Sequence, residues 1–210
     1  MCWNAEVSLN TFLLSAIVLA LVIYNNSFTK YKIQELNDKW MYIFIISVIL
    51  MQLIEFFIWK NVNNKFYNNI FSTFAAFLLV IQPITSLMLL KNIQLRNLLL
   101  SLYSSLAIPY SIYKSLTNNM RSIVTRNGHL RWNFFGGGAI VSIIWFFFFL
   151  FSFIYERQWF GLIFGIIALI MAYLNNSIDG SVWSMWCWGV NLLAIYYAIY
   201  MLIYLPFLDI

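Results

Sequence analysis

The chain has 210 residues, of which 63% are hydrophobic and only 9% are charged. An average soluble domain carries roughly 25% charged residues, so this composition excludes a soluble globular protein with a polar surface. The 12 basic and 7 acidic residues give a net charge of +5. In so apolar a chain we attribute this excess to loops beside the anionic headgroups of a lipid bilayer, and we expect no nucleic-acid partner.

Seven apolar segments, separated by Asn-rich or charged connections, predict an all-α integral membrane protein. They are residues 5–24, 40–59, 70–90, 95–113, 134–155, 160–174 and 182–205. We therefore expect a single transmembrane domain over residues 1–210, folded as a seven-helix bundle with short loops. An odd number of spans would place the N- and C-termini on opposite sides of the membrane. The first segment lacks the basic start of a signal peptide, so we expect it to be retained.

The connections predict turns because asparagine recurs in them, at 25–27, 61–64, 68–69 and 175–180. The longest connection, 114–133, is the only one with room for structure of its own. Six basic residues would lie on each side of the membrane, so the positive-inside rule gives no orientation.

Polar side chains within the apolar segments indicate where a function is expected, because such groups are costly in lipid. Glu6 and Asn10 lie one turn apart on the first segment, and Gln52 and Glu55 share a face of the second. The second segment returns to the side of the membrane on which the chain begins, which we call the N-terminal face. We therefore expect the two carboxyl groups to lie close together and to share a proton.

Further polar residues are expected at the same face. Gln82 precedes Pro83 in the third segment, and Pro83 frees the carbonyl group four residues earlier, which must find another donor inside the protein. Asp179 lies just before the seventh segment. The complete set of pocket candidates is Glu6, Asn10, Gln52, Glu55, Gln82, His129, Trp132, Trp186, Cys187 and Asn191. This set predicts a polar pocket that opens on one side of the membrane, with a gated pore as the alternative. We expect the first, second and seventh helices to be neighbours around it.

Several chemistries are excluded because the residues they require are missing. One histidine and two distant cysteines, Cys2 and Cys187, form no metal-binding pattern. No lysine follows Lys114, so a retinal Schiff base in the seventh helix is impossible, and the identity of any cofactor stays open. If the N-terminal face is extracytosolic and their Cα atoms approach within ~7 Å, the two cysteines are expected to pair.

Five short motifs resemble an uncharacterised family of small multi-pass membrane proteins from bacteria, fungi and large DNA viruses. They are MCWNAE at 1–6, MQLIE at 51–55, Gln82-Pro83, GHLRWN at 128–133 and Trp186-Cys187. The family pattern has tryptophan where this chain has Gly128, and some members have histidine in place of Leu78, which removes the basis for a shared metal site there. The abundance of Asn, Ile, Tyr and Phe is typical of an AT-rich genome and favours a viral member.

The resemblance implies no activity. It implies only that a set of residues belongs to one site: Cys2, Glu6, Glu55, Gln82, His129, Trp132 and Cys187.

The leading hypothesis is a transporter or channel whose one-sided polar pocket binds or conducts a small solute, a proton or a cation, with Glu6 and Glu55 as acceptors. The first alternative is a membrane-embedded enzyme acting on a lipid or a small apolar substrate, with Glu55 as general base and His129 as acid or ligand. The second alternative is a structural or assembly protein whose polar groups only lock the bundle. The substrate, the membrane, the orientation and the oligomeric state stay open.

Overall fold

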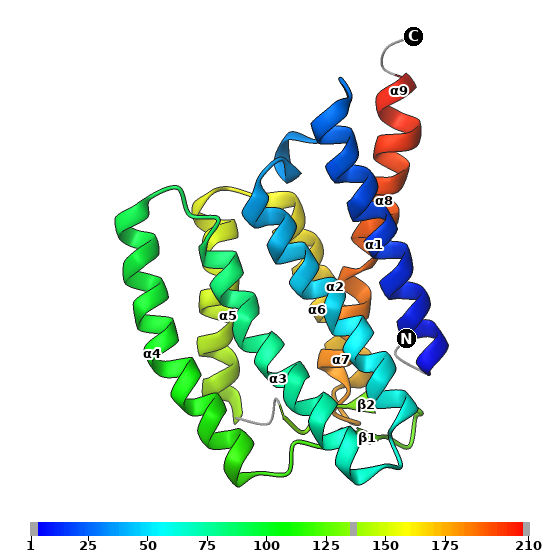
Figure 1. Cartoon of the computed structure of the whole chain (residues 1–210), viewed down its shortest axis with the longest axis vertical. Helices are drawn as coiled ribbons and strands as arrows, with labels where there is room; N and C mark the ends of the chain where they lie inside the picture. The colour runs from blue at the N-terminus through cyan, green and yellow to red at the C-terminus, as the bar shows by residue number, and fades with distance from the viewer. Residues whose placement is uncertain (1–3, 135–137, 208–210) are drawn as a thin grey trace.

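The computed structural model describes residues 4–134 and 138–207 (Figure 1). The helices are α1 (Ala5–Phe28), α2 (Lys39–Lys60), α3 (Lys65–Leu87), α4 (Ile93–Thr117), α5 (Gly138–Tyr155), α6 (Trp159–Asn176), α7 (Val182–Val190), α8 (Leu192–Ile199) and α9 (Leu205–Phe207). A 3-10 turn, η1 (Gln34–Leu36), follows α1, and a π-helical turn, η2 (Tyr200–Tyr204), joins α8 to α9. The elements from α7 to α9 form one long helical unit, so the seven predicted segments correspond to seven helical units.

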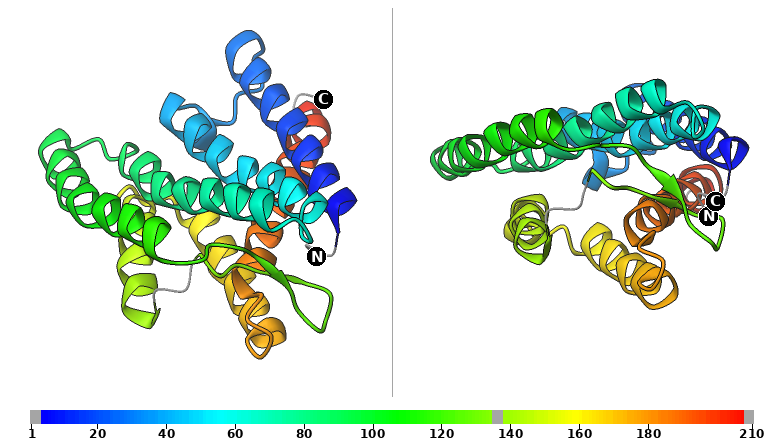
Figure 2. Two further views of the ribbon diagram at one scale, coloured as in Figure 1. Left: turned by 60° about the horizontal axis from the view of Figure 1, so that its bottom comes forward. Right: turned by 90° about the horizontal axis from the view of Figure 1, so that it is seen from below.

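The helical units pack in two layers (Figure 2). In one layer α1, α2, α3 and α4 stand side by side in chain order, and in the other α5 is followed by α6 and the α7–α9 unit. Across the layers α1 contacts α8, α2 contacts α7, and α3 contacts α5. The first, second and seventh helices are therefore neighbours, as expected.

Five of these units are long and apolar enough to cross a membrane: α1, α2, α3, α6 and the α7–α9 unit. In α5, residues Ile140–Tyr155 form a shorter apolar helix. The fourth helix, α4, does not meet this criterion among the described residues, because Arg96, Lys114 and several serines lower its hydropathy. The described residues thus form seven helical units, and five of these units have the length and hydropathy of a membrane span.

Asparagine and aspartate side chains fix where the helices of the first layer begin. Asn4 accepts a hydrogen bond from the amide of Val7 at 2.8 Å, and Asp38, Asn64 and Asn92 cap α2, α3 and α4 in the same way. Such caps stabilise a helix by about 0.5–2 kcal/mol because they satisfy amide groups that have no helical partner. Several polar residues in the connections between apolar segments are therefore helix caps.

Three predicted connections are wrong in whole or in part. Residues 25–27 were expected in a turn but lie inside α1, which continues to Phe28, and Asn175 and Asn176 form the end of α6. An asparagine inside a helix and one in a turn have the same local sequence signal, so hydropathy ended these helices too early.

Asn68 and Asn69 were also expected in a turn, but Asn64 caps α3 early enough that both lie inside this helix. Their side chains instead bind the long connection after α4. Asn68 accepts from the amide of Ser122 and donates to its carbonyl group, both at 3.0 Å. Asn69 accepts from the amide of Met120 at 3.1 Å.

The connection after α4 contains a β-hairpin of β1 (Ile123–Val124) and β2 (Leu130–Arg131), which pair in antiparallel fashion. Its turn includes Gly128 with φ of 76°, a left-handed conformation that glycine adopts at little cost. The hairpin lies at the end of the bundle where α2 ends and α7 begins (Figure 1). There β2 contacts α7.

Aromatic rings fill much of the space between the layers. Trp145 stacks on Phe149 with ring centroids 4.5 Å apart and meets Trp186 edge-on at 6.1 Å. Phe44 of α2 contacts Phe149 and Phe153 at 5.4 and 5.2 Å. Aromatic pairs at such distances contribute about 0.5–1.5 kcal/mol each beyond their burial. These contacts hold α5 against α2 and α7 against α5.

Candidate functional site

Glu55 is the centre of a buried polar cluster at the hairpin end of the bundle. Its side chain is 0% exposed, and its Oε1 atom accepts hydrogen bonds from Trp132 Nε1 at 3.0 Å and from Ser184 Oγ at 2.7 Å. We call these three residues the Glu55 cluster. They come from α2, from the segment after β2 and from α7, so one carboxyl group ties together three distant parts of the chain. Gln52 is equally buried one turn earlier on α2.

The hairpin delivers Trp132 to this cluster because α3 holds the hairpin's first residues in place. The hydroxyl groups of Ser72 and Ser122 are 2.9 Å apart, next to the paired bonds between Asn68 and Ser122. Trp132 then stacks on Phe134, with ring centroids 5.2 Å apart. The buried serines and Asn68 therefore position an indole donor over the end of α2.

Asp179, in the loop between α6 and α7, binds the outer side of the hairpin. Its carboxylate accepts hydrogen bonds from the amide and hydroxyl of Ser181, from Asn127 at 3.3 Å and from Thr125 at 3.4 Å. Burial raises the pKa of Asp179, but the hydrogen bonds from Ser181 and Asn127 and the nearby charge of His129 outweigh this effect. The pKa of Asp179 is therefore lowered from its ordinary value of 3.8.

His129 is half-buried in the hairpin, beside Asp179. Its amide donates to the hydroxyl of Thr125 at 3.2 Å, and its carbonyl accepts from the amide of Thr125 at 2.8 Å. The electrostatic influence of His129 on Asp179 links it to the loop carboxylate. His129 thus belongs to the contact between the hairpin and the loop before α7.

Glu6 and Asn10 lie outside the Glu55 cluster. Both are exposed on α1, and Glu6 occupies the first turn of that helix, where a negative charge is favourable to the helix dipole. The expectation that Glu6 and Glu55 lie together in one buried pocket is therefore wrong, because Glu6 is exposed while Glu55 is fully buried. Glu6 and Asn10 therefore do not contribute to a buried polar pocket.

Pro83 has the consequence expected of a proline inside a helix. The carbonyl group of Leu79, four residues earlier, receives no helical hydrogen bond and accepts one from Trp145 Nε1 at 2.7 Å. Next to it, Gln82 is buried and donates to the carbonyl group of Ser47 in α2 at 3.2 Å. The Gln82-Pro83 pair therefore connects α3 to α2 in its own layer and to α5 in the other layer.

The candidates in the seventh helix are buried together. Trp186 Nε1 donates to the carbonyl group of Gly165 in α6 at 2.9 Å, and the Asn191 amide donates to the carbonyl group of Cys187 at 2.7 Å. The Cys187 thiol is buried and close enough to Glu55 to interact with it electrostatically. Cys2 lies outside the described residues, and so does its expected pairing with Cys187.

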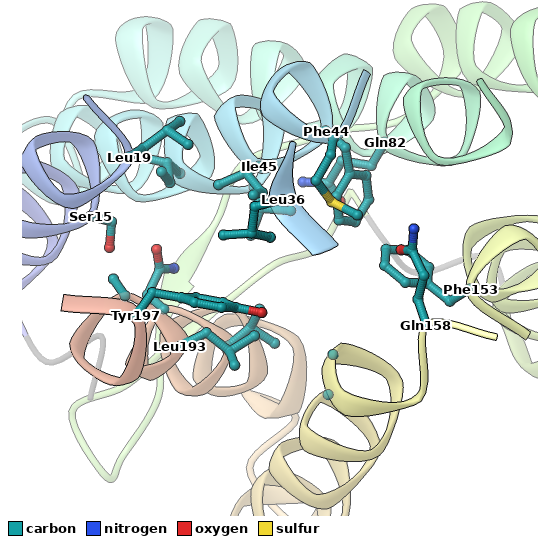
Figure 3. A pocket seen from close by; sticks show the side chains of 18 of the residues that line it. Ser15, Leu19, Leu36, Phe44, Ile45, Gln82, Phe153, Gln158, Leu193 and Tyr197 are labelled. Carbon is teal, nitrogen blue, oxygen red and sulfur yellow. The ribbon is translucent and has the colours of Figure 1, made fainter. Parts of the chain in front are cut away.

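A cavity of about 160 Å³ lies between the layers, lined by α1, η1, α2, α5, α6, α7 and α8, with one contribution from α3, Gln82 (Figure 3). We call it the inner cavity. Most of its wall consists of Val, Leu, Ile and Phe side chains. Gly161 and Gly165 of α6 also line it, and a Cβ atom added at either would meet no atom within 4 Å. The wall is therefore apolar and incompletely filled.

The inner cavity extends from Cys187, near the Glu55 cluster, toward the opposite end of the bundle, where Glu35 and Gln158 line it. This differs from the polar pocket expected at the N-terminal face. The polar groups at that face bind one another and the hairpin, so the unfilled space is left among apolar side chains.

Two polar atoms at the inner cavity have no hydrogen-bond partner in the described part of the chain. Ser15 is 2% exposed, and its Oγ atom is buried without a partner. The Oε1 atom of Gln158 is also buried without one. Figure 3 shows both side chains at the cavity. Buried polar groups are almost always satisfied in native proteins, so these atoms indicate a place for a hydrogen-bonding group of a bound molecule.

Within residues 4–134 and 138–207, no three His, Cys, Asp or Glu side chains come together as metal ligands would. No protein-family model, curated protein or solved structure matches this chain. The family resemblance in the sequence therefore stays a prediction, and the geometry of the site carries the functional argument.

Sequence reasoning missed most of the partners of the predicted residues. Ser184 and the Asn68, Ser72 and Ser122 group were not proposed, although each is a polar residue at a helix position or connection that packs inside the protein. Serine in an apolar segment is common and carries a weak signal by itself. Ser15 was missed for the same reason, since only the structure shows that its hydroxyl group lacks a partner.

Proposed function

We propose that this protein is an integral multi-pass membrane protein that binds a small uncharged apolar molecule, or the apolar end of one, in the inner cavity. The observation that carries the proposal is an apolar cavity between the layers in which the buried hydroxyl of Ser15 has no partner among the described residues. The five apolar helices of spanning length support a bilayer location. With seven crossings, the N- and C-termini would lie on opposite sides.

Cavity size and charge define the class of ligand. An engineered cavity of about 150 Å³ in another protein takes up benzene, so about 160 Å³ accommodates a ring or a short length of alkyl chain. Glu35 lines the same cavity and disfavours an anion. Ser15 and Gln158 supply the only two buried partnerless polar atoms of the described cavity wall. These features favour a lipid-derived alcohol or carbonyl compound over an ion.

The experiment is photolabelling of the purified protein in detergent with octanol that carries a diazirine on the third carbon, followed by mass spectrometry of the labelled peptides. We expect labels on α1, α2 and α8. Ala194→Phe fills the inner cavity from α8 and should abolish this labelling. The matched control is Ile195→Phe, at a neighbouring exposed position outside the cavity wall. Equal labelling of both variants would contradict the proposal.

The second candidate is conduction of a proton or a small cation, and the observation that favours it is the fully buried carboxyl group of Glu55. Glu55→Gln keeps the side-chain shape and an oxygen that accepts from Trp132 and Ser184. In liposomes, a conducting protein would lose its proton or cation flux with this variant. If wild type shows no flux above empty liposomes between pH 5 and pH 8, or if Glu55→Gln preserves both the flux and its pH profile, this candidate is wrong.

A further inference from the structure

A second cavity, of about 270 Å³, lies between α3, α4 and α5. It is separate from the inner cavity, since the two share no lining residue. Its wall is apolar apart from a few groups on α4, which include the side chains of Tyr103, Ser111 and Lys114. We call it the outer cavity, because α4 lies at the edge of its layer and contacts α3 on one side (Figure 2).

The stretch of sequence that contributes α3, α4 and α5 carries only basic charges. No acidic residue occurs between Glu55 and Glu156, a stretch that includes α3, α4, the hairpin and α5. The same stretch contains eight basic residues: Lys60, Lys65, Lys91, Arg96, Lys114, Arg121, Arg126 and Arg131. Among the described residues that line the outer cavity, Lys114 is the only charged one, so an anionic group is the complementary one.

Lys114 is the charged residue at the edge of the apolar cavity wall. It is half-buried in the last turn of α4 and lines the outer cavity. Its Nζ atom lies next to the side-chain amide of Asn118, whose oxygen accepts from it at 2.8 Å when that amide is turned over. A lysine that covers apolar surface with its methylene groups and directs its ammonium group to the interface is suited to an amphiphile. Tyr103 is buried deeper in the same wall and its hydroxyl donates to the carbonyl group of Val80 at 3.2 Å.

We propose that the outer cavity binds one acyl chain of an anionic phospholipid whose phosphate group pairs with Lys114. The volume exceeds that of the inner cavity and suits part of an alkyl chain, while the apolar wall gives no site for a free anion. The negative charge of the phosphate compensates the positive charge of Lys114 at the cavity wall. This site is independent of the ligand proposed for the inner cavity.

The test is native mass spectrometry of the purified full-length protein with phosphatidylglycerol or phosphatidylcholine, the two lipids having identical oleoyl chains. One lysine near an anionic headgroup predicts a preference for phosphatidylglycerol of about fivefold. Lys114→Gln should remove this preference. The control Lys65→Gln removes the same charge at the same end of the bundle, from an exposed residue outside the cavity wall, and should keep it.

A second pair of variants tests whether the outer cavity holds the acyl chain of the lipid. Ala107→Phe fills the outer cavity from α4 and should lower binding of both lipids at least tenfold, whereas Leu98→Phe, at a 65% exposed position outside the wall, should not. If Ala107→Phe does not fold, Val141→Phe fills the same space from α5.

Three results would overturn the proposal. Equal losses with Lys65→Gln and Lys114→Gln would mean that only the overall charge matters. Unchanged lipid binding by Ala107→Phe or Val141→Phe would mean that the acyl chain binds outside the outer cavity. Displacement of the lipid by free glycerol phosphate would show a site for the headgroup alone. Each of these outcomes leaves the labelling of the inner cavity unaffected, so the two proposals fail separately.

Discussion

At the scale of single residues, buried polar atoms divide into those with partners and those without. Glu55 has two donors from distant segments, and its role in holding the hairpin to α2 and α7 follows from them. Ser15 is as deeply buried, but its hydroxyl has no partner in the described chain. A satisfied group adds to the stability of the empty protein, whereas a partnerless one lowers it.

Replacing Ser15 is therefore expected to stabilise the empty protein. Ser15→Ala removes the unsatisfied hydroxyl and should raise the free energy of unfolding by about 1 kcal/mol, measured by SDS titration of delipidated protein in mixed micelles. Ser8→Ala is the control, because Ser8 is buried on the same helix and its hydroxyl donates to the carbonyl group of Asn4. A loss of stability with Ser15→Ala, equal to that with Ser8→Ala, would show that Ser15 is satisfied.

The carboxylate of Asp179 predicts a pH dependence for the hairpin. Because the pKa of Asp179 is lowered from 3.8 in the folded protein, its contribution to stability is fully present above that value. It is lost as the pH falls through the folded pKa. Hydrogen exchange of residues 122–132, corrected for intrinsic rates, should show constant protection from pH 7 to pH 5 and a loss of protection only below 3.8.

Two substitutions separate this effect from general acid unfolding. Asp179→Asn should flatten the pH profile of the hairpin. Asp38→Asn, which changes the cap of α2 at the other end of the bundle, should leave it unchanged. A profile that persists in Asp179→Asn would mean that another group controls the hairpin.

At the scale of elements, the kink residue Pro83 and the indole of Trp145 form a matched pair across the two layers. Trp145→Phe leaves the Leu79 carbonyl group without a donor and should cost about 1–3 kcal/mol of unfolding free energy. In a Pro83→Ala background the helix itself supplies an amide to that carbonyl group, so the same substitution should cost less. Equal costs in both backgrounds, in a double-mutant cycle, would contradict this account.

Helix positions could be predicted because hydropathy acts locally. The need of the Leu79 carbonyl group for a new donor followed from Pro83 alone, whereas the caps formed by Asn4, Asp38 and Asn92 were found in the structure. Asn68 was misplaced because an asparagine inside a helix and one in a turn have the same local sequence signal. Its partner, Ser122, is distant in the chain, so only the tertiary structure identifies it.

At the scale of the whole molecule, the two-layer packing determines which polar residues meet. Glu55, Cys187 and Trp132 were expected together, and the structure brings them together, but Glu6 remained outside because α1 turns that side chain away. A cavity depends on the combined side-chain volumes of several segments, so no single stretch of sequence predicts it. The inner cavity and the layer arrangement are therefore results of the structure alone.

The central claim is that the inner cavity holds an apolar molecule from the membrane. Native mass spectrometry of protein purified directly from its expression membrane in mild detergent tests it, with collisional release and identification of the retained molecules. The account predicts that wild type and Ile195→Phe retain an uncharged apolar compound that Ala194→Phe lacks, while all three keep the anionic lipid. Retention of the same compound by Ala194→Phe, or its absence from wild type, would contradict the claim.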